Sequence, residues 1–327
     1  MTATRRTPMN KAAARVGLVH GQDRRANVYQ ALDLVREEVI PRLRPQVMLK
    51  PNFLSSTNQL ASSHPDALRG AIDFLLSTPE PPQEILIAEG GNEKIPGEAF
   101  RNFGYHALVD EYDVPIRLVD LNQETEWVET PIILADHSET TVRMPKTVLD
   151  CPCTISMAVA KTHDVCVVTL ALKNMIMGTI CKADRVKMHG FPSHPERRLP
   201  DEARILNINL IRLARFLSPD IAVIDGTDGL QGNGPGGEDA VPGFGVAVAS
   251  VDVFAADAVM ARAMGFEPLE LGLLHYGHQL GMGVADLAQI EVRGTRLEEV
   301  ITPFKPHEKT PLQMQWHEPA AARFLPA

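Results

Sequence analysis

The chain is poor in cysteine and lacks the cysteine patterns that mark metal or cluster proteins. Only 4 of its 327 residues are cysteine, all between positions 151 and 181. No second pair follows at zinc-ribbon distance, and there is no ferredoxin-type run of cysteines. We therefore expect no bound iron–sulfur cluster and no disulfides, and we expect the protein to be cytoplasmic, the simplest compartment for free thiols.

Long apolar runs and excess positive charge are also missing. No run reaches the roughly 18–20 apolar residues of a membrane-spanning helix, so we expect no membrane partner. The 32 lysines and arginines are outnumbered by 41 aspartates and glutamates, which gives a formal net charge of −9. Such a balance argues against a nucleic-acid partner, because non-specific binding to nucleic acid needs a broad basic surface. The composition does not decide whether the chain forms a homo-oligomer.

What is present is a chain long enough for a large core. A length of 327 residues with 44% hydrophobic residues suits one large or two ordinary domains. The basic first residues are not followed by the apolar segment of a signal peptide. We expect residues 1–15 to be a disordered tail and residues 16–327 to form the folded domain.

Short apolar strands alternate with helices along most of this domain. Strands are predicted at 15–20, 46–50, 84–89, 115–120, 153–160, 221–225, 246–250 and 290–294. Helices are predicted at 25–39, 65–76, 97–103, 201–217 and 253–264. This alternation is typical of an α/β fold with a mainly parallel sheet flanked by helices. Residues 124–150 break the rhythm with a hairpin-like pattern, so a division into two lobes, with the site in the cleft between them, would fall near 121–150.

Polar or glycine-rich sequence follows several predicted strands. The segments are Lys50-Pro51-Asn52, Glu89-Gly90-Gly91-Asn92, Lys161-Thr162-His163 and Asp225-Gly226. In open parallel sheets, ligands bind outside the carboxyl ends of the strands. We therefore predict that these strand ends meet on one edge of the sheet and form the binding site.

Residues 160–190 place lysines, histidines and an arginine around a short apolar run. An unpaired buried ammonium is costly, so we expect Lys173 and His163 to face an anion in one cleft. The alternative is that Lys173 neutralises a structural carboxylate. His189 is a candidate for proton transfer or metal binding, with Asp184 as the partner of its second ring nitrogen. The alternative is an incidental histidine in a surface loop.

A glycine-rich segment follows the strand at 221–225. It holds six glycines in the thirteen residues 225–237, and its backbone N–H groups could form an anion nest. Asp225 and Asp228 could bind a cation or a ligand hydroxyl; the alternative is a mobile surface loop. Signatures of other enzyme classes are absent: the Rossmann glycine pattern, the P-loop, His-Glu-x-x-His and Gly-x-Ser-x-Gly.

Taken together, these segments resemble the DUF362 family. The resemblance rests on KPN at 50–52, AEGG at 88–91, AKTH at 160–163, TLALKN at 169–174 and the run from the glycine-rich segment to Gly265. It extends roughly from Val16 to Arg293. The family is defined by sequence rather than by a settled activity, so the resemblance implies the fold more firmly than the function.

A more distant resemblance is to the nickel-pincer lactate racemase family. His163, Lys173 and His189 stand at the spacings of that family's acid/base histidine, cofactor-linked lysine and metal-ligating histidine. The chain departs from the family elsewhere. Thr-Leu-Ala-Leu precedes Lys173 in place of a glycine-rich segment, and Gly90-Gly91-Asn92 replaces a histidine turn. The resemblance therefore implies a related fold and cleft position, not racemisation.

The sequence thus predicts an α/β enzyme that acts on a small anionic organic substrate. The candidate catalytic residues are His163, Lys173 and His189. The candidate binding residues are Lys50, Asn52, Gly90, Gly91, Lys161, Asn174, Arg185, Asp225, Gly232 and Gly234. The sequence does not identify a cofactor; the candidate ligands for a divalent metal are His189 and Asp225. The reaction class stays open among lyase, hydrolase and isomerase, with a third hypothesis of Asp225 and Asp228 holding a cation. The alternative to an enzyme is a non-catalytic accessory protein that binds a ligand or metallocofactor.

Overall fold

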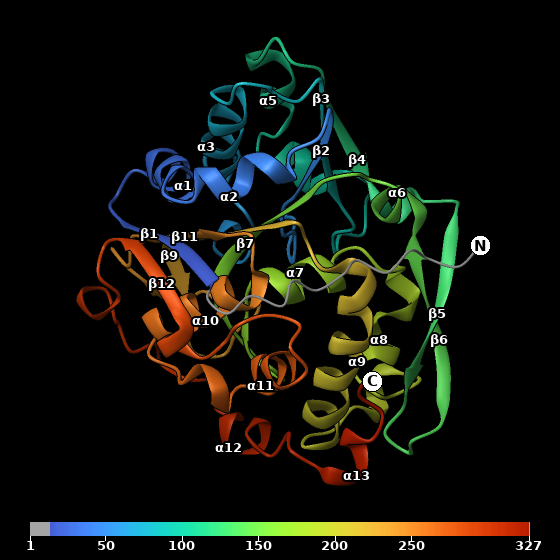
Figure 1. The fold of residues 1–327 in the computed structure, drawn as a ribbon. Helices are drawn as coiled ribbons and strands as arrows, with labels where there is room; N and C mark the ends of the chain where they lie inside the picture. Colours follow the sequence, from blue (N-terminus) through green and yellow to red (C-terminus); the bar gives the residue numbers. More distant parts are fainter. Residues whose placement is uncertain (1–13, 327) are drawn as a thin grey trace.

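One large sheet forms the centre of the molecule in the computed structural model, which describes residues 14–326 (Figure 1). The strand order is β12 (Ile290–Gly294), β1 (Ala14–His20), β11 (Val246–Ser250), β9 (Ile221–Leu230), β7 (Thr154–His163), β2 (Gln46–Lys50), β3 (Glu84–Glu89) and β4 (Ile116–Asp120). Two short strands, β8 (Val167–Thr169) and β10 (Ala240–Val241), pair with β7 and β9. The predicted strands are all found, and the α/β class is confirmed.

Strand direction places most of the carboxyl ends on one edge of the sheet. Along the main order only β11 runs against its neighbours β1 and β9, while the other pairs are parallel. A short link suffices to join β9 to β11, because an antiparallel neighbour needs no helical crossover. The ends of β9, β7, β2 and β3 therefore lie side by side, as the sequence predicts for the binding edge.

Helices cover both faces of the sheet and enclose two buried apolar clusters. One face is covered by α1 (Arg24–Asp33), α2 (Arg36–Val39), α3 (Pro65–Leu76), α4 (Glu98–Asn102) and α5 (His106–Glu111). The other is covered by α7 (Ala171–Met177) and α10 (Val253–Ala263), with α9 (Asp201–Leu217) and α11 (Gly272–Gln279) packed outside them. The remaining short helices are α6 (Lys146–Leu149), α8 (Arg185–Met188), α12 (Thr310–Gln313) and α13 (Pro319–Ala322).

The hairpin predicted within 124–150 is present. Strands β5 (Trp127–Ile133) and β6 (Glu139–Pro145) pair antiparallel and lie against α9 and α8 (Figure 1). Their buried side chains, among them Ile132 and Val142, belong to the same apolar cluster as α7 and α10. Of the predicted tail, residues 1–13 lie outside the described residues, whereas Ala14 and Arg15 belong to β1. None of the described helices is long and apolar enough to cross a bilayer.

A carboxylate from α10 fixes the start of α7, the helix that carries Lys173. The side chain of Asp257 accepts the N–H groups of Ala171 and Leu172 at 2.7 and 3.1 Å. These donors have no partner inside the helix, so the carboxylate satisfies them and complements the helix dipole. Burial raises the pKa of Asp257 to about 7 in spite of the two N–H donors.

Replacement of this residue should change how stability depends on pH. An unfolded aspartate titrates near pH ~3.9, whereas Asp257 in the folded chain titrates at about 7. Between these values the folded state holds a proton that the unfolded state has lost, so this residue's contribution to the free energy of unfolding falls as pH rises. In Asp257→Asn that contribution disappears. Urea unfolding of both proteins across the window should show the stability advantage of the native protein shrinking towards neutral pH.

The exposed Asp113→Asn variant serves as the control, because its stability should follow the native curve at every pH. Parallel pH profiles for native protein and Asp257→Asn would contradict the prediction.

Candidate functional site

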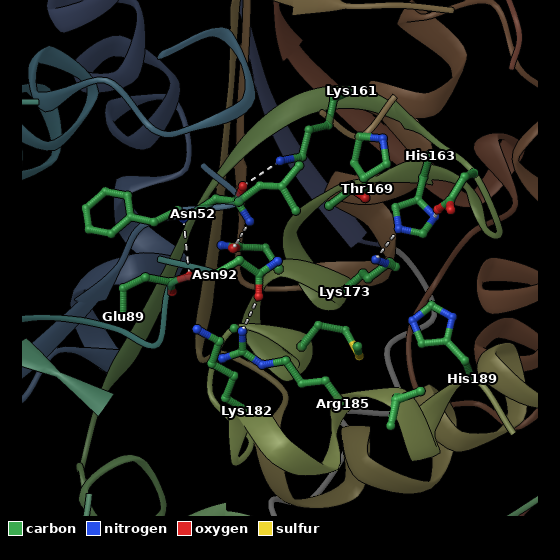
Figure 2. Close-up of a pocket in the computed structure, with 18 of the residues that line it drawn as sticks. Asn52, Glu89, Asn92, Lys161, His163, Thr169, Lys173, Lys182, Arg185 and His189 are labelled. Atoms are coloured by element: carbon green, nitrogen blue, oxygen red, sulfur yellow. Dashed lines mark hydrogen bonds and ion pairs between the residues drawn. The ribbon is translucent and has the colours of Figure 1, made fainter. Parts of the chain in front are cut away.

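A polar cavity of about 550 Å³ lies at the carboxyl ends of β2, β3 and β7 (Figure 2). Its wall is completed by α7 and by the segment that runs from Lys182 to Arg197. The structure brings most of the predicted site residues into its lining. These are Asn52, Lys161, His163, Lys173, Asn174, Arg185 and His189. The predicted residues outside the lining are Lys50, Gly90, Gly91, Asp225, Gly232 and Gly234.

Lys50 lies directly beneath the cavity and is fully buried. Its ammonium forms an ion pair with Glu89 from the neighbouring strand and donates to Oδ1 of Asn174 at 2.9 Å and to the Pro51 carbonyl at 2.7 Å. A Cβ on Gly178 would come within 2.2 Å of Nζ, so only glycine fits there. Burial lowers the pKa of Lys50 and raises the pKa of Glu89, and each partner opposes the shift of the other. Lys50 is thus a structural cation, joined to strand β3 and helix α7.

Removal of one partner of this pair should destabilise the fold strongly. In Lys50→Met, Glu89 becomes a buried carboxylate without its counter-ion, a situation that costs about 3–5 kcal/mol. The double variant Lys50→Met with Glu89→Gln removes both charges and should recover at least half of that loss. Urea unfolding at neutral pH measures both.

The exposed pair of Lys146 and Glu126, with Nζ and Oε2 2.9 Å apart, provides the matched comparison. Lys146→Met should destabilise the fold far less, because water screens exposed pairs. A loss in Lys50→Met no larger than in Lys146→Met would overturn the structural role of Lys50.

Two asparagines connect this buried pair to Lys161. Asn52 donates to Oδ1 of Asn174 at 2.9 Å, and its own Oδ1 accepts from Nζ of Lys161 at 2.5 Å. Lys161 also donates to the carbonyl of Ala61 at 2.7 Å. Among the described residues, no carboxylate lies within 4 Å of Nζ. Burial is the main cause that holds the pKa of Lys161 well below its usual range. The second cause is Lys173 whenever its amine is protonated.

His163 and Lys173 form a buried pair on the opposite wall. Nζ of Lys173 lies 2.9 Å from Nε2 of His163. Nδ1 of the same ring accepts the backbone N–H groups of Val165 at 2.9 Å and Cys166 at 3.3 Å. The tight β7–β8 turn creates this arrangement and holds Val167 at φ 66, which is strained for a β-branched residue. Burial lowers the pKa of both His163 and Lys173.

His189 faces the same cavity and is oriented by a carboxylate on α9. Its Nδ1 lies 3.0 Å from Oε1 of Glu202, which also accepts from Nε of Arg197 at 2.5 Å. With Nδ1–H donated to Glu202, Nε2 keeps a free lone pair. Burial lowers the pKa of His189, although Glu202 acts in the opposite direction. The prediction that Asp184 would be this partner was wrong, because the Asp184 carboxylate accepts hydrogen bonds from Arg143 and Lys187 at 2.7 and 2.8 Å.

Apart from Oε2 of Glu89, which is ion-paired with Lys50, two buried polar atoms of the lining have no hydrogen-bond partner within residues 14–326. They are Nε of Arg185 and Oγ1 of Thr169. The rest of the Arg185 guanidinium is held in place, because Nη1 donates to Asn92 at 2.8 Å (Figure 2) and Nη2 donates to the carbonyl of Gly90. Buried polar groups are normally satisfied. These two atoms are themselves enclosed, with almost no accessible surface.

The glycine-rich segment lies beside the cavity and contributes Pro235 to its lining. The N–H of Gly232 donates to the backbone carbonyl of Lys305 at 2.7 Å, and the N–H of Gly234 donates to the Gly232 carbonyl at 2.8 Å. These two N–H groups are therefore not directed at an anion. A Cβ on Gly234 would lie 2.2 Å from the Thr162 carbonyl, so glycine allows the segment to rest against the end of β7.

Asp225 and Asp228 both pair with a cation outside this cavity. Arg24 donates to Asp225 at 2.7 Å and to Asp228 at 2.6 Å. The two predicted metal ligands therefore lie apart, with His189 in the cavity lining and Asp225 outside it. Within residues 14–326, no three His, Cys, Asp or Glu side chains are grouped closely enough to hold a metal ion. This donor set does not fit a metal held by protein side chains alone.

Several site residues carry no sequence signal that distinguishes them. Glu202 falls within a long amphipathic helix, and Thr169 falls within an apolar run, so each takes its role from the tertiary fold. Asn92 follows Gly90-Gly91 in the sequence but is not among the predicted binding residues. The signal for Glu202 is that it is a carboxylate on the long helix that follows His189.

The chain matches known proteins over most of its length. Residues 47–262 match the family described as "Domain of unknown function (DUF362)". The thylakoid-associated protein sll1697 of Synechocystis sp. is 24% identical over 278 residues, covering 79% of this chain and 78% of that protein. Among solved structures, the lactate racemase apoprotein from Thermoanaerobacterium thermosaccharolyticum has a TM-score of 0.49 and 12% identity. That match covers 77% of this chain but only 57% of the racemase chain.

Proposed function

The chain belongs to the DUF362 family, as the motifs of its sequence indicated, and from its site we propose that it is an enzyme acting on a small organic anion. The substrate would enter the cavity at the carboxyl ends of β2, β3 and β7 and present a carboxylate or phosphate to its cationic wall. This proposal rests on the cavity's own side chains.

One observation carries the proposal: Lys161 is buried and Arg185 is half-buried beside one cavity, and no carboxylate within residues 14–326 lies within 4 Å of their charged nitrogens. An isolated buried cation is costly, as the fully paired Lys50 shows by contrast. An anion in the cavity would supply the missing counter-charge. Charge-assisted hydrogen bonds to a carboxylate or phosphate are among the strongest available in a protein.

The binding wall can be assigned residue by residue. The guanidinium of Arg185 lines the cavity and is already oriented by Asn92 and Gly90, so little side-chain entropy is lost on binding. Lys161 is held by Asn52 and a carbonyl and keeps a third hydrogen for the ligand when protonated.

The opposite wall favours turnover over passive binding. His163 with Lys173, and His189 with Glu202, are two titratable pairs facing one space. An anion-binding module needs donors only. A histidine whose Nδ1 is held by a carboxylate while Nε2 stays free is the arrangement used for general acid/base catalysis.

Anion binding should be measurable by calorimetry with inorganic phosphate, pyruvate and succinate as probes. We expect saturable binding of at least one probe to the native protein. Arg185→Met should weaken it by about 10–100-fold, the equivalent of losing a hydrogen bond between charged groups. The exposed Lys309→Met should bind like the native protein.

The affinity should also fall as pH rises. Lys161 has a lowered pKa in the free protein, and a bound anion raises it again, so binding takes up a proton in the intervening pH range. Titration in buffers of different ionisation enthalpy reports this uptake directly. Equal affinity in the native protein and a folded Arg185→Met variant, or no binding of any of the three probes, would contradict the proposal.

A further inference from the structure

The protonation state of Lys173 follows from the hydrogen bonds around His163. A neutral imidazole carries one proton, on one of its two ring nitrogens. Nδ1 of His163 faces the backbone N–H groups of Val165 and Cys166, whose directions are fixed by the turn. The single ring proton therefore lies on Nε2, which is 2.9 Å from Nζ of Lys173. Nζ must accept this proton's hydrogen bond, and only an uncharged amine has the lone pair to do so.

A nearby carboxylate does not change this assignment. Oδ1 of Asp164 lies 3.2 Å from Nδ1 of His163 and could in principle take a proton placed there. Such a proton would point at the two backbone hydrogens, which cannot turn away. Asp164 is also partly exposed and lies 3.7 Å from the Arg197 guanidinium, which offers it a cation instead.

The burial of Lys173 and the charge of Arg197 also favour an uncharged amine, whereas Asp164 acts in the opposite direction. Burial is the main cause of the lowered pKa of Lys173. Cys166 raises the pKa of Lys173 only to the extent that it ionises, and burial raises the pKa of that thiol to about 12, so it carries no charge near neutral pH. Behind Lys173 lie the apolar side chains of Leu271 and Leu274 and the carboxyl of Asp257, which is occupied by the N–H groups of α7. No charged group of the described chain within 4 Å compensates an ammonium at this position.

We propose that Lys173 is a nucleophilic amine that condenses with the carbonyl group of a small oxo acid to form a Schiff base. This deepens the proposed function and rests on it. The Arg185 guanidinium and Lys161, which line the cavity, would bind the acid group, while the carbonyl carbon meets Nζ. An uncharged buried lysine is the form of the side chain that attacks carbonyl compounds.

The step is balanced without an oxidant or reductant. The Nζ lone pair forms a C–N bond while the carbonyl π electrons move to oxygen. Two protons leave Nζ in turn and reach that oxygen, which departs as water with the electrons of the C–O bond, leaving a C=N bond. The free Nε2 of His189 is the group that can carry these protons, because Glu202 holds its Nδ1. His163 helps to keep the resting amine uncharged and oriented.

The experiment traps the Schiff base in the intact native protein. Pyruvate and 2-oxoglutarate are each added with cyanoborohydride, whose hydride reduces the C=N bond to a stable secondary amine, and the modified lysines are located by peptide mass spectrometry. Lys173 should be modified first. Its rate should change little between pH ~7 and ~9, whereas the rate for the free model amine Nα-acetyl-lysine should rise about tenfold per pH unit, as expected for an amine far below its pKa.

Parallel titrations of the same oxo acids and of lactate, without reductant, separate the two proposals. Lactate has the carboxylate but no carbonyl group. If these acids bind but Lys173 is not modified, or is modified with the pH dependence of the model amine, the nucleophile assignment is overturned and the anion site stands. If neither oxo acid, lactate, phosphate nor succinate binds and no adduct forms, the proposed function fails with it. The Lys173→Arg protein should still bind lactate but should form no adduct at the site. This result would assign the adduct to Lys173.

Discussion

The buried ion pair between Lys50 and Glu89 is the interaction on which the site depends. It joins the ends of β2 and β3, and through Asn174 it also holds α7, the helix that carries Lys173. The close approach of Gly178 to the Lys50 ammonium brings the end of α7 down onto the sheet. A buried pair with one partner missing would leave an uncompensated charge. These elements therefore have little freedom to separate, and the cavity above them keeps its shape.

The fold was predictable from the sequence because its signals are local. Alternating apolar strands and amphipathic helices predicted α3, α9, β3, β11 and β12 with the bounds that the structure shows. The rule that parallel strands share one binding edge then placed Lys161 and His163 in the site. The antiparallel course of β11 was not predicted, since an apolar strand carries no mark of its direction.

The pairing of charged residues was far less predictable, because partners come from distant parts of the chain. Arg24 lies about two hundred residues before Asp225, yet their side chains are 2.7 Å apart. Asp225 therefore looked like a free carboxylate in the sequence, although the structure gives it a counter-ion outside the cavity. In the same way Glu202, rather than the nearby Asp184, orients His189. Periodicity reports which face of a helix is buried but not which group it meets.

These pairings matter because the protein as a whole is acidic, with a formal net charge of −9, so its long-range field repels an anion. The cavity can attract one only if nearby carboxylates are neutralised locally. The structure meets that condition: Glu89 is matched by Lys50, and Glu202 and the lining residue Asp164 both lie beside Arg197. A charge that lines a low-dielectric cavity produces a much stronger electric field there than the distant surface charges, which water and salt screen. The unmatched Lys161 and Arg185 can therefore dominate within the cavity, while a neutral Lys173 beside them would remain free to react.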